Sequence, residues 1–324
     1  MLNLDMTRLA RTILLAASVA YGVTSVTPLS ASAPMAKFSA PGFFRLMVGE
    51  FELTVLSDGT ADIPMDQLLH QKPAKTKAAL RSAFLKSPLE TSFNSYLINT
   101  GDKLVLIDTG AGSLFGPTLG KLVANLKAAG YQPEQIDEIY LTHLHPDHVG
   151  GLVSGGQLAF PNATVRADQR DSEYWLSQAN LEHAAQSDKG FFQGAMASLK
   201  PYVDANKFKP FTSNTELVPG IKSISTYGHS AGHTSYLVES KGSQVLVVGD
   251  LIHVPAVQLE NPSVSIAFDA DPRLATEVRA KTFNRIAADG TLVGAAHIQF
   301  PGLGHLRRSG TAYQWVPVNF TQMR

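Results

Sequence analysis

The stretch that decides the fold is Thr142-His143-Leu144-His145-Pro146-Asp147-His148-Val149-Gly150-Gly151. Residues two apart on an extended chain point to the same side, so His143 and His145 share a face. Pro146 ends the extended segment, and the turn presents Asp147 and His148 from another direction. Imidazole and carboxylate together suit Zn²⁺ and related divalent ions. The stretch therefore predicts a metal site.

Three more potential ligands stand beside predicted apolar strands. His233 directly precedes one strand, whereas Asp250 and His297 each follow one. Sheet proteins place their reactive groups at strand ends, so these side chains are expected near the histidine-rich loop. The full set predicts two divalent metal ions, with zinc the expected metal, bound only by histidine and carboxylate because the chain has no cysteine.

Apolar periodicity places strands in neighbouring runs with helices between them. Strands are expected over 49–56, 95–99, 103–107, 136–142, 163–167, 221–226, 234–239, 244–248 and 291–296, and helices over 76–85, 117–129, 168–177, 189–204 and 272–288. This order indicates an α+β fold with two mixed sheets and helices on the outer faces.

Residues 1–35 are typical of a secretory signal peptide. Arg8 and Arg11 precede an apolar run over 13–23, and small residues end near Ala33. We expect cleavage between about 31 and 36, a periplasmic or secreted protein, and no stable membrane insertion afterwards. Residues 36–324 are expected to form a single hydrolase domain. Lys plus Arg and Asp plus Glu both total 27, which argues against a nucleic-acid partner.

These motifs resemble the metallo-β-lactamase superfamily. The resemblance lies in the HLHPDH stretch, Gly232-His233-Thr234, Gly249-Asp250, the late His297, and Leu106-Ile107-Asp108-Thr109-Gly110. Segments 115–120, 125–135, 189–192 and 300–305 are similar to the methyl parathion hydrolase group and its lactone-cleaving relatives of the dihydrocoumarin hydrolase type. The resemblance implies a four-layer αβ/βα sandwich and a homodimer.

The resemblance also implies roles for the ligands. His143, His145 and His233 would bind one ion, and Asp147, His148 and His297 the other. Asp250 would bridge the ions, which would share the attacking hydroxide, and Asp108 would support the ligand loop. Asp250 and Asp147 could also carry a proton to the leaving oxygen.

The substrate pocket implied by the resemblance is aromatic and bulky. Phe115, Trp175 and Phe191 match the aromatic pocket of the methyl parathion hydrolase group. The chain departs from its phosphotriesterase members at Leu68, His253, Ile266 and Phe268. The bulkier wall favours a flat aryl lactone or ester, with phosphotriester cleavage as a side activity. His253 is expected either to hydrogen-bond the substrate or to be a wall residue only.

Several alternatives stay open. Methyl parathion hydrolysis could be the main activity, or the chain could be an acyl-homoserine lactonase. A β-lactamase, a glyoxalase-II-like thioesterase, a nuclease and a non-catalytic binding protein are less favoured. The remaining histidines are interpreted as structural or surface residues, with His229 also a candidate to support the ligands: His70, His183, His229 and His305.

Overall fold

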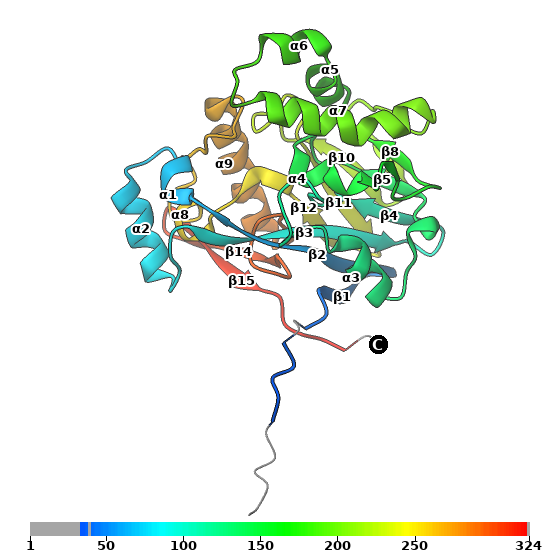
Figure 1. The fold of residues 1–324 in the computed structure, drawn as a ribbon. Helices are drawn as coiled ribbons and strands as arrows, with labels where there is room; N and C mark the ends of the chain where they lie inside the picture. Colours follow the sequence, from blue (N-terminus) through cyan, green and yellow to red (C-terminus); the bar gives the residue numbers. More distant parts are fainter. Residues whose placement is uncertain (1–32, 38–39, 323–324) are drawn as a thin grey trace, which may run out of the picture. The chain divides into compact units, whose positions relative to one another are not determined.

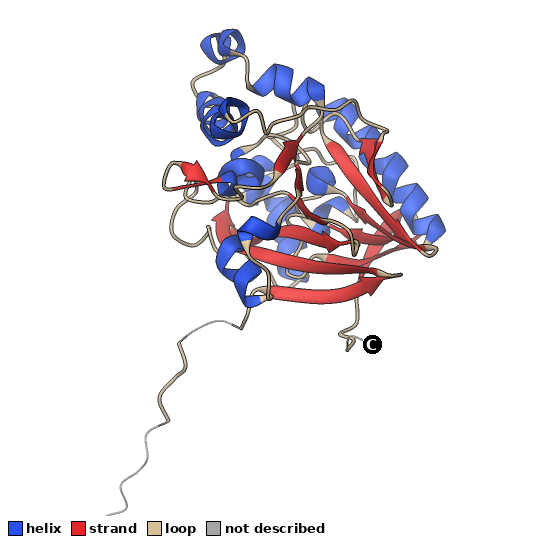
Figure 2. Cartoon of the chain, turned by 90° about the vertical axis from the view of Figure 1, so that its right-hand side faces the viewer, coloured by secondary structure: helices blue, strands red, loops and turns tan. Residues whose placement is uncertain are grey.

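Two mixed β-sheets pack face to face in the part of the chain that carries the predicted site (Figures 1 and 2). The computed structural model describes residues 33–37 and 40–322, so the predicted signal peptide lies almost wholly outside the described residues. Residues 33–37 have no regular secondary structure and are not part of the unit that begins at Ala40. Within the described ranges, every helix is too short or too polar to cross a bilayer.

The first sheet contains six strands in the order β1-β2-β3-β4-β5-β8. Their bounds are β1 Phe43–Val48, β2 Phe51–Ile63, β3 Leu89–Asn99, β4 Leu104–Ile107, β5 Glu138–Tyr140 and β8 Thr164–Arg166. The pairs from β1 to β4 are antiparallel, and β4-β5 and β5-β8 are parallel. Parallel neighbours need a crossover connection, and here the chain between β4 and β5 contains a helix.

The second sheet contains seven strands in the order β15-β14-β13-β12-β11-β10-β9. Their bounds are β9 Glu216–Val218, β10 Ile221–Ser225, β11 Thr234–Ser240, β12 Ser243–Val247, β13 Leu292–Gly294, β14 Leu303–Ser309 and β15 Ala312–Pro317. Only the pair β12-β13 is parallel within this sheet. A small hairpin, β6 Val153–Ser154 and β7 Gln157–Leu158, stands apart from both sheets.

Helices cover the outer face of each sheet, and further helices pack beside the sheets (Figure 1). They are α1 Met65–Leu68, α2 Pro73–Ser82, α3 Leu122–Ala128, α4 Pro146–Val149, α5 Gln169–Trp175, α6 Gln178–His183, α7 Lys189–Asp204, α8 Pro255–Gln258 and α9 Pro272–Asp289. One core cluster joins α3, α5 and α7 to the first sheet, and another joins α9 to the second. A third core lies between the sheets, where Tyr140 stacks on Tyr236 at 5.6 Å. The predicted four-layer α+β sandwich is confirmed.

Local sequence signals explain the two longest helices. In α7 the buried side chains Phe192, Ala195, Leu199 and Tyr202 recur every three or four residues, which forms one apolar stripe. In α9 the Asp271 side chain accepts a hydrogen bond from the Leu274 amide at 2.9 Å and caps the first turn. Gly290, at φ +66°, then ends α9 in the left-handed conformation.

Four strands deliver the candidate ligands to one edge of the sandwich. β4 leads into Asp108, β5 into His143, β12 into Asp250 and β13 into His297. All four residues follow the carboxyl ends of their strands, and all four side chains are buried. Because parallel neighbours end at the same edge, side chains distant in sequence converge there.

Candidate metal centre

Two groups of imidazole and carboxylate side chains meet at Asp250. The first contains His143, His145, His229 and Asp250, and the second contains Asp147, His148, Asp250 and His297; within each group the potential ligand atoms lie within 4.8 Å of one another. Asp250 Oδ1 lies 3.2 Å from both His148 Nε2 and His297 Nε2. Asp250 Oδ2 lies 3.3 Å from His229 Nε2. The two carboxylate oxygens therefore serve different groups, as a bridging ligand would.

Hydrogen bonds on the opposite ring nitrogen orient three of these histidines. His148 Nδ1 lies 2.8 Å from Asp108 Oδ2, and His229 Nδ1 lies 2.9 Å from Asp269 Oδ1. His297 Nδ1 lies 3.1 Å from the Ser92 carbonyl oxygen. An acceptor at Nδ1 fixes the proton there and leaves the Nε2 lone pair free to bind a metal ion.

The chemistry of the unpartnered atoms fits a divalent metal ion. His143 Nε2, His148 Nε2 and Asp250 Oδ1 are buried and form no hydrogen bond in the structure. Buried polar atoms normally have a hydrogen-bond partner, so three buried atoms without one in the same small volume need an explanation. Nitrogen and carboxylate oxygen donors are those that zinc and similar ions take.

Asp108 supports the ligand loop from behind. Its carboxylate accepts hydrogen bonds from the Thr142 amide at 2.7 Å and the Thr142 hydroxyl at 2.8 Å, in addition to its contact with His148. Asp108 adopts φ +60°, an unfavourable conformation for a residue with a side chain. Asp108 thus contacts both Thr142 and His148 of the ligand loop.

The structure differs from the prediction at His233. Its Nε2 accepts a hydrogen bond from the Asp250 amide at 3.0 Å, and its Nδ1 lies 2.8 Å from the Thr226 hydroxyl. Both ring nitrogens are therefore engaged by protein, and the site described above contains His229 instead. Burial, together with the positive charge of His229, lowers the pKa of His233 to about 3, which keeps its ring neutral.

A buried charged pair stands behind His229. Asp269 Oδ2 accepts a hydrogen bond from the Ile266 amide at 3.0 Å and lies 3.8 Å from Arg279 Nη2. Arg279, on α9, is 1% exposed and also donates to the backbone carbonyls of Leu251, Pro262 and Val264. One guanidinium thus joins the carboxylate that orients His229 to the segment that follows Asp250.

A cavity of about 430 Å³ opens onto both ligand groups. Of the predicted pocket residues, Phe115, Phe191, His253 and Phe268 line it. The structure corrects the other three. Ile266 and Leu68 pack in the core around α1 and α8, and Trp175 lies behind His145, with ring centroids 5.0 Å apart.

Sequence reasoning missed one side of this cavity. Ala61, Asp62, Ile63, Met65 and Phe93 line it. The first three stand at the end of β2, which continues to Ile63 instead of ending near residue 56. A register shift between Ser57 and Gly59 interrupts the alternating pattern there, so periodicity gave no signal for the extension.

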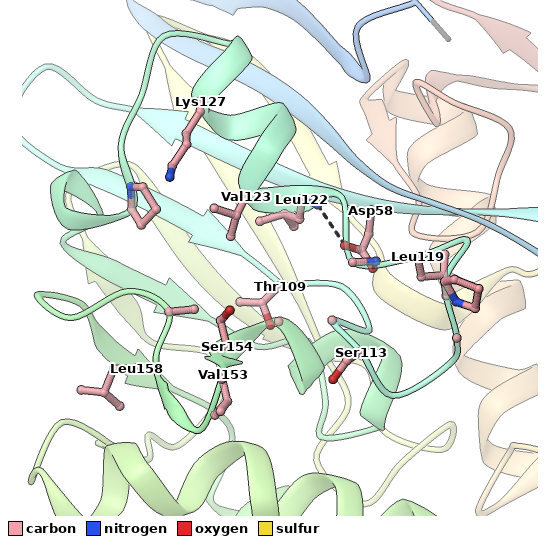
Figure 3. A pocket seen from close by; sticks show the side chains of 18 of the residues that line it. Asp58, Thr109, Ser113, Leu119, Leu122, Val123, Lys127, Val153, Ser154 and Leu158 are labelled. Atoms are coloured by element: carbon pink, nitrogen blue, oxygen red, sulfur yellow. Dashed lines mark hydrogen bonds between the residues drawn. The ribbon is translucent and has the colours of Figure 1, made fainter. Parts of the chain in front are cut away.

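Asp58 holds the loop that carries Phe115 into the cavity. Its buried carboxylate accepts hydrogen bonds from the amides of Ala111, Gly120 and Leu122, at 2.9, 3.1 and 3.0 Å. Figure 3 shows Asp58 beside Leu122 at the edge of a second cavity of about 750 Å³, on the side of the loop facing α3. Burial raises the pKa of Asp58 while these amides lower it.

This fold and this paired ligand set define a class of two-metal hydrolase sites, and comparison with known proteins assigns the family. The sequence profile of the metallo-beta-lactamase superfamily matches residues 91–297, and the chain belongs to that superfamily. An N-acyl homoserine lactonase from a Bacillus species is 29% identical over 207 residues, or 57% of this chain and 74% of the relative.

Two solved structures are similar over most of both chains. The crystal structure of hydrolase AbOPH, in the beta lactamase superfamily, is 35% identical with a TM-score of 0.83, covering 88% of this chain and 100% of that one. AidC, a dizinc quorum-quenching lactonase in complex with the product N-hexnoyl-L-homoserine, is 26% identical with a TM-score of 0.80, covering 87% and 99%.

Replacing His229 and His233 separately should give different results. His229→Ala removes a candidate ligand, so bound metal should fall from two ions per chain toward one. His233→Ala leaves the buried Asp250 amide without an acceptor, which should cost ~1–3 kcal/mol of folding stability while both ions are retained. Elemental analysis and urea unfolding measure the two effects. Metal loss in the His233 variant alone would contradict this assignment.

Asp269→Asn should weaken one ion selectively. Asparagine has a single acceptor oxygen, so it cannot accept hydrogen bonds from both His229 Nδ1 and the Ile266 backbone amide. It also leaves Arg279 without a carboxylate partner. The metal affinity of the ligand group that contains His229 should fall by ~10–100-fold, and the metal affinity of the group that contains His297 should not change. Competition with a chelator resolves the two affinities. Asp289→Asn, an exposed change at the end of the helix that carries Arg279, is the matched control, and equal effects of the two changes would contradict this role.

Metal-depleted protein should lose stability as pH rises. Burial opposes protonation of His229 and His297, but Asp250, Asp269 and Asp147 outweigh it and raise their pKa values to about 9 and about 10. Raised histidine pKa values stabilise the folded state below the ordinary value of 6.5, and this contribution disappears as pH passes the raised values.

The test compares chelator-treated protein from pH 6.5 to 10 by urea unfolding, and the unfolding midpoint should decrease over that range. Zinc affinity should increase over the same range because protons no longer compete for the ring nitrogens. An unfolding midpoint independent of pH, or a zinc affinity that decreases, would show that these histidines do not hold protons in the metal-free protein.

Proposed function

We propose that this metal-dependent hydrolase is a dizinc enzyme that opens aryl lactones and cleaves aryl esters. The observation that carries the proposal is the position of Asp250. Its two oxygens each face a separate ligand group, and both groups open into one cavity with aromatic walls. The two groups would hold two divalent ions, and such ions, when bound, would supply a hydroxide at neutral pH and neutralise charge on the substrate oxygens.

The chain's own residues would position the substrate. Phe115, Phe191 and Phe268 present ring surfaces on which a flat aromatic lactone can pack. Asp147 lines the same cavity, and the neighbouring His148 and His297 hold its pKa below the ordinary value despite burial. It is therefore ionised, as a metal ligand must be, and its position beside the cavity is what supports a proposed role in passing a proton to the leaving oxygen.

His253 is proposed to contact the reacting part of the substrate. Its Nε2 lies 3.1 Å from Asp250 Oδ2, and its ring stacks on that of His297 at 5.2 Å. Its Nδ1 is buried and forms no hydrogen bond in the structure, so a polar group remains at the cavity wall without a protein partner. A substrate oxygen or leaving group could provide that partner after a small rotation of the ring.

The second candidate substrate class is the acyl-homoserine lactones. The similar Bacillus protein is named for that activity, and AidC is a quorum-quenching lactonase in complex with the product N-hexnoyl-L-homoserine. The apolar side of the cavity, formed by Ile63, Met65 and Phe93, would accommodate a short acyl chain. Phosphotriester hydrolysis is proposed only as a side activity, because two bulky side chains, Phe268 and His253, line the cavity.

A substrate panel on zinc-loaded protein tests the proposal. Dihydrocoumarin and phenyl acetate should give the highest kcat/KM, acyl-homoserine lactones lower values, and methyl parathion the lowest. A preference for acyl-homoserine lactones of tenfold or more would select the second candidate. Loss of turnover on chelation and recovery with zinc is the control. Zinc-loaded protein that leaves every substrate intact would end the proposal.

His253→Leu should separate the two reaction types. Loss of its imidazole should lower kcat/KM for dihydrocoumarin by ~10–100-fold, corresponding to one hydrogen bond made in the transition state. Methyl parathion turnover should remain the same or rise, since leucine lacks the polar group. His70→Leu, an exposed change outside the cavity, is the matched control. Equal losses on both substrates would mean that His253 acts only through Asp250.

A further inference from the structure

Helix α2 and the turn after it form a basic surface at the periphery of the molecule (Figure 1). Five of the chain's 27 Lys and Arg residues fall within residues 72–86, and no Asp or Glu occurs between Asp66 and Glu90. All five side chains are exposed: Lys72, Lys75, Lys77, Arg81 and Lys86. Within the described part of the chain, only Lys77 has an acidic partner, Asp66 at 3.1 Å. A chain of zero net charge thus concentrates positive charge on one helix.

A fully exposed aromatic ring stands at the end of the same helix. Phe84 is 99% exposed. Its φ of +60° is unfavourable for any residue with a side chain, and its amide donates to the Arg81 carbonyl at 3.0 Å. The chain therefore holds the ring outward at an energetic cost, whereas the adjacent Leu85 packs against the core. An exposed apolar ring beside five cations indicates a surface that contacts a binding partner when the protein functions.

We propose that α2 and Phe84 dock the protein on an anionic lipid surface. Phe84 would enter the interfacial region, where aromatic rings bind well, while the five cations face lipid phosphates. A symmetric contact with a second copy would place two such basic surfaces against each other, which is unfavourable. The surface is a helix and its end rather than a groove, which suits a flat surface better than a peptide or a nucleic-acid strand.

The location of this surface connects docking with the reaction cavity. Helix α2 packs through Leu80 on the core that contains Met65 and Ile266. Met65 also lines the cavity, so the docking helix is built on the cavity wall. An apolar lactone concentrates in a bilayer, and docking would bring the cavity close to that supply. Only this last step depends on the proposed function; docking itself is a matter of charge and exposure.

The experiment is co-sedimentation of zinc-loaded protein with vesicles. Vesicles of phosphatidylglycerol and phosphatidylcholine in equal parts should bind the protein, and pure phosphatidylcholine should not. Raising salt should release it, since the attraction is screened. Lys75→Gln with Lys86→Gln should weaken binding by about 25-fold, at about fivefold per charge. Phe84→Ser should weaken it by about tenfold.

Matched variants separate docking from folding and net charge. Lys121→Gln with Lys222→Gln removes the same charge outside α2, and Phe320→Ser removes another exposed ring; both should bind vesicles like the parent protein. Turnover of a soluble substrate should be unchanged in every variant, so a failure of the proposed activity would not be mistaken for a failure of docking.

Two kinds of outcome would overturn the proposal. One is equal binding of the parent protein and the Phe84 variant to anionic vesicles, or no binding at all. The other is self-association or binding to an oligonucleotide that is lost on Phe84→Ser while vesicles remain unbound, which would assign this surface to a protein or nucleic-acid partner instead.

Discussion

The interaction on which the site depends is the sharing of one buried carboxylate between two sets of histidines. Asp250 is 2% exposed, and its oxygens face His148 and His297 on one side and His229 on the other. A buried carboxylate without compensation is costly, and the neighbouring imidazoles hold its pKa well below the ordinary value despite burial. The fold must therefore bring the carboxyl ends of β4, β5, β12 and β13 to one place before any of these groups can be tolerated in the interior.

The supporting layer is as specific as the ligands. Asp108 and Asp269 each fix one ligand histidine, and each is itself held by other groups, Thr142 in the first case and Arg279 in the second. Such orientation determines which ring nitrogen is free for metal and how precisely it is aimed. Because Arg279 also binds the carbonyls of Pro262 and Val264, the segment that forms the cavity wall and the His229 ligand belong to one network.

Apolar periodicity predicts two mixed sheets with helices on their outer faces, and the family resemblance implies the four-layer sandwich that the structure has. The clustered histidines leave a strong local signal, and the structure brings all the predicted ligands except His233 into the two groups. The bounds of α7 were predicted to the residue. The sequence favours His233 over His229 because His233 directly precedes strand β11. At that position, however, the ring of His233 accepts a hydrogen bond from the Asp250 amide. Which of two histidines four residues apart faces the ions depends on the path of a loop, and sequence periodicity does not report it.

The cavity was harder to predict than the ligands for a related physical reason. Metal ligands are recognisable as residue types, whereas a cavity wall depends on which apolar side chains remain unpacked after the core forms. Ile266 is expected in the cavity wall from the resemblance yet is fully buried in the core. Phe93 lines the cavity from β3, just before the strand predicted over 95–99. Apolar side chains at a reaction site and in a core have the same chemistry, so only their three-dimensional surroundings distinguish specificity residues from packing residues.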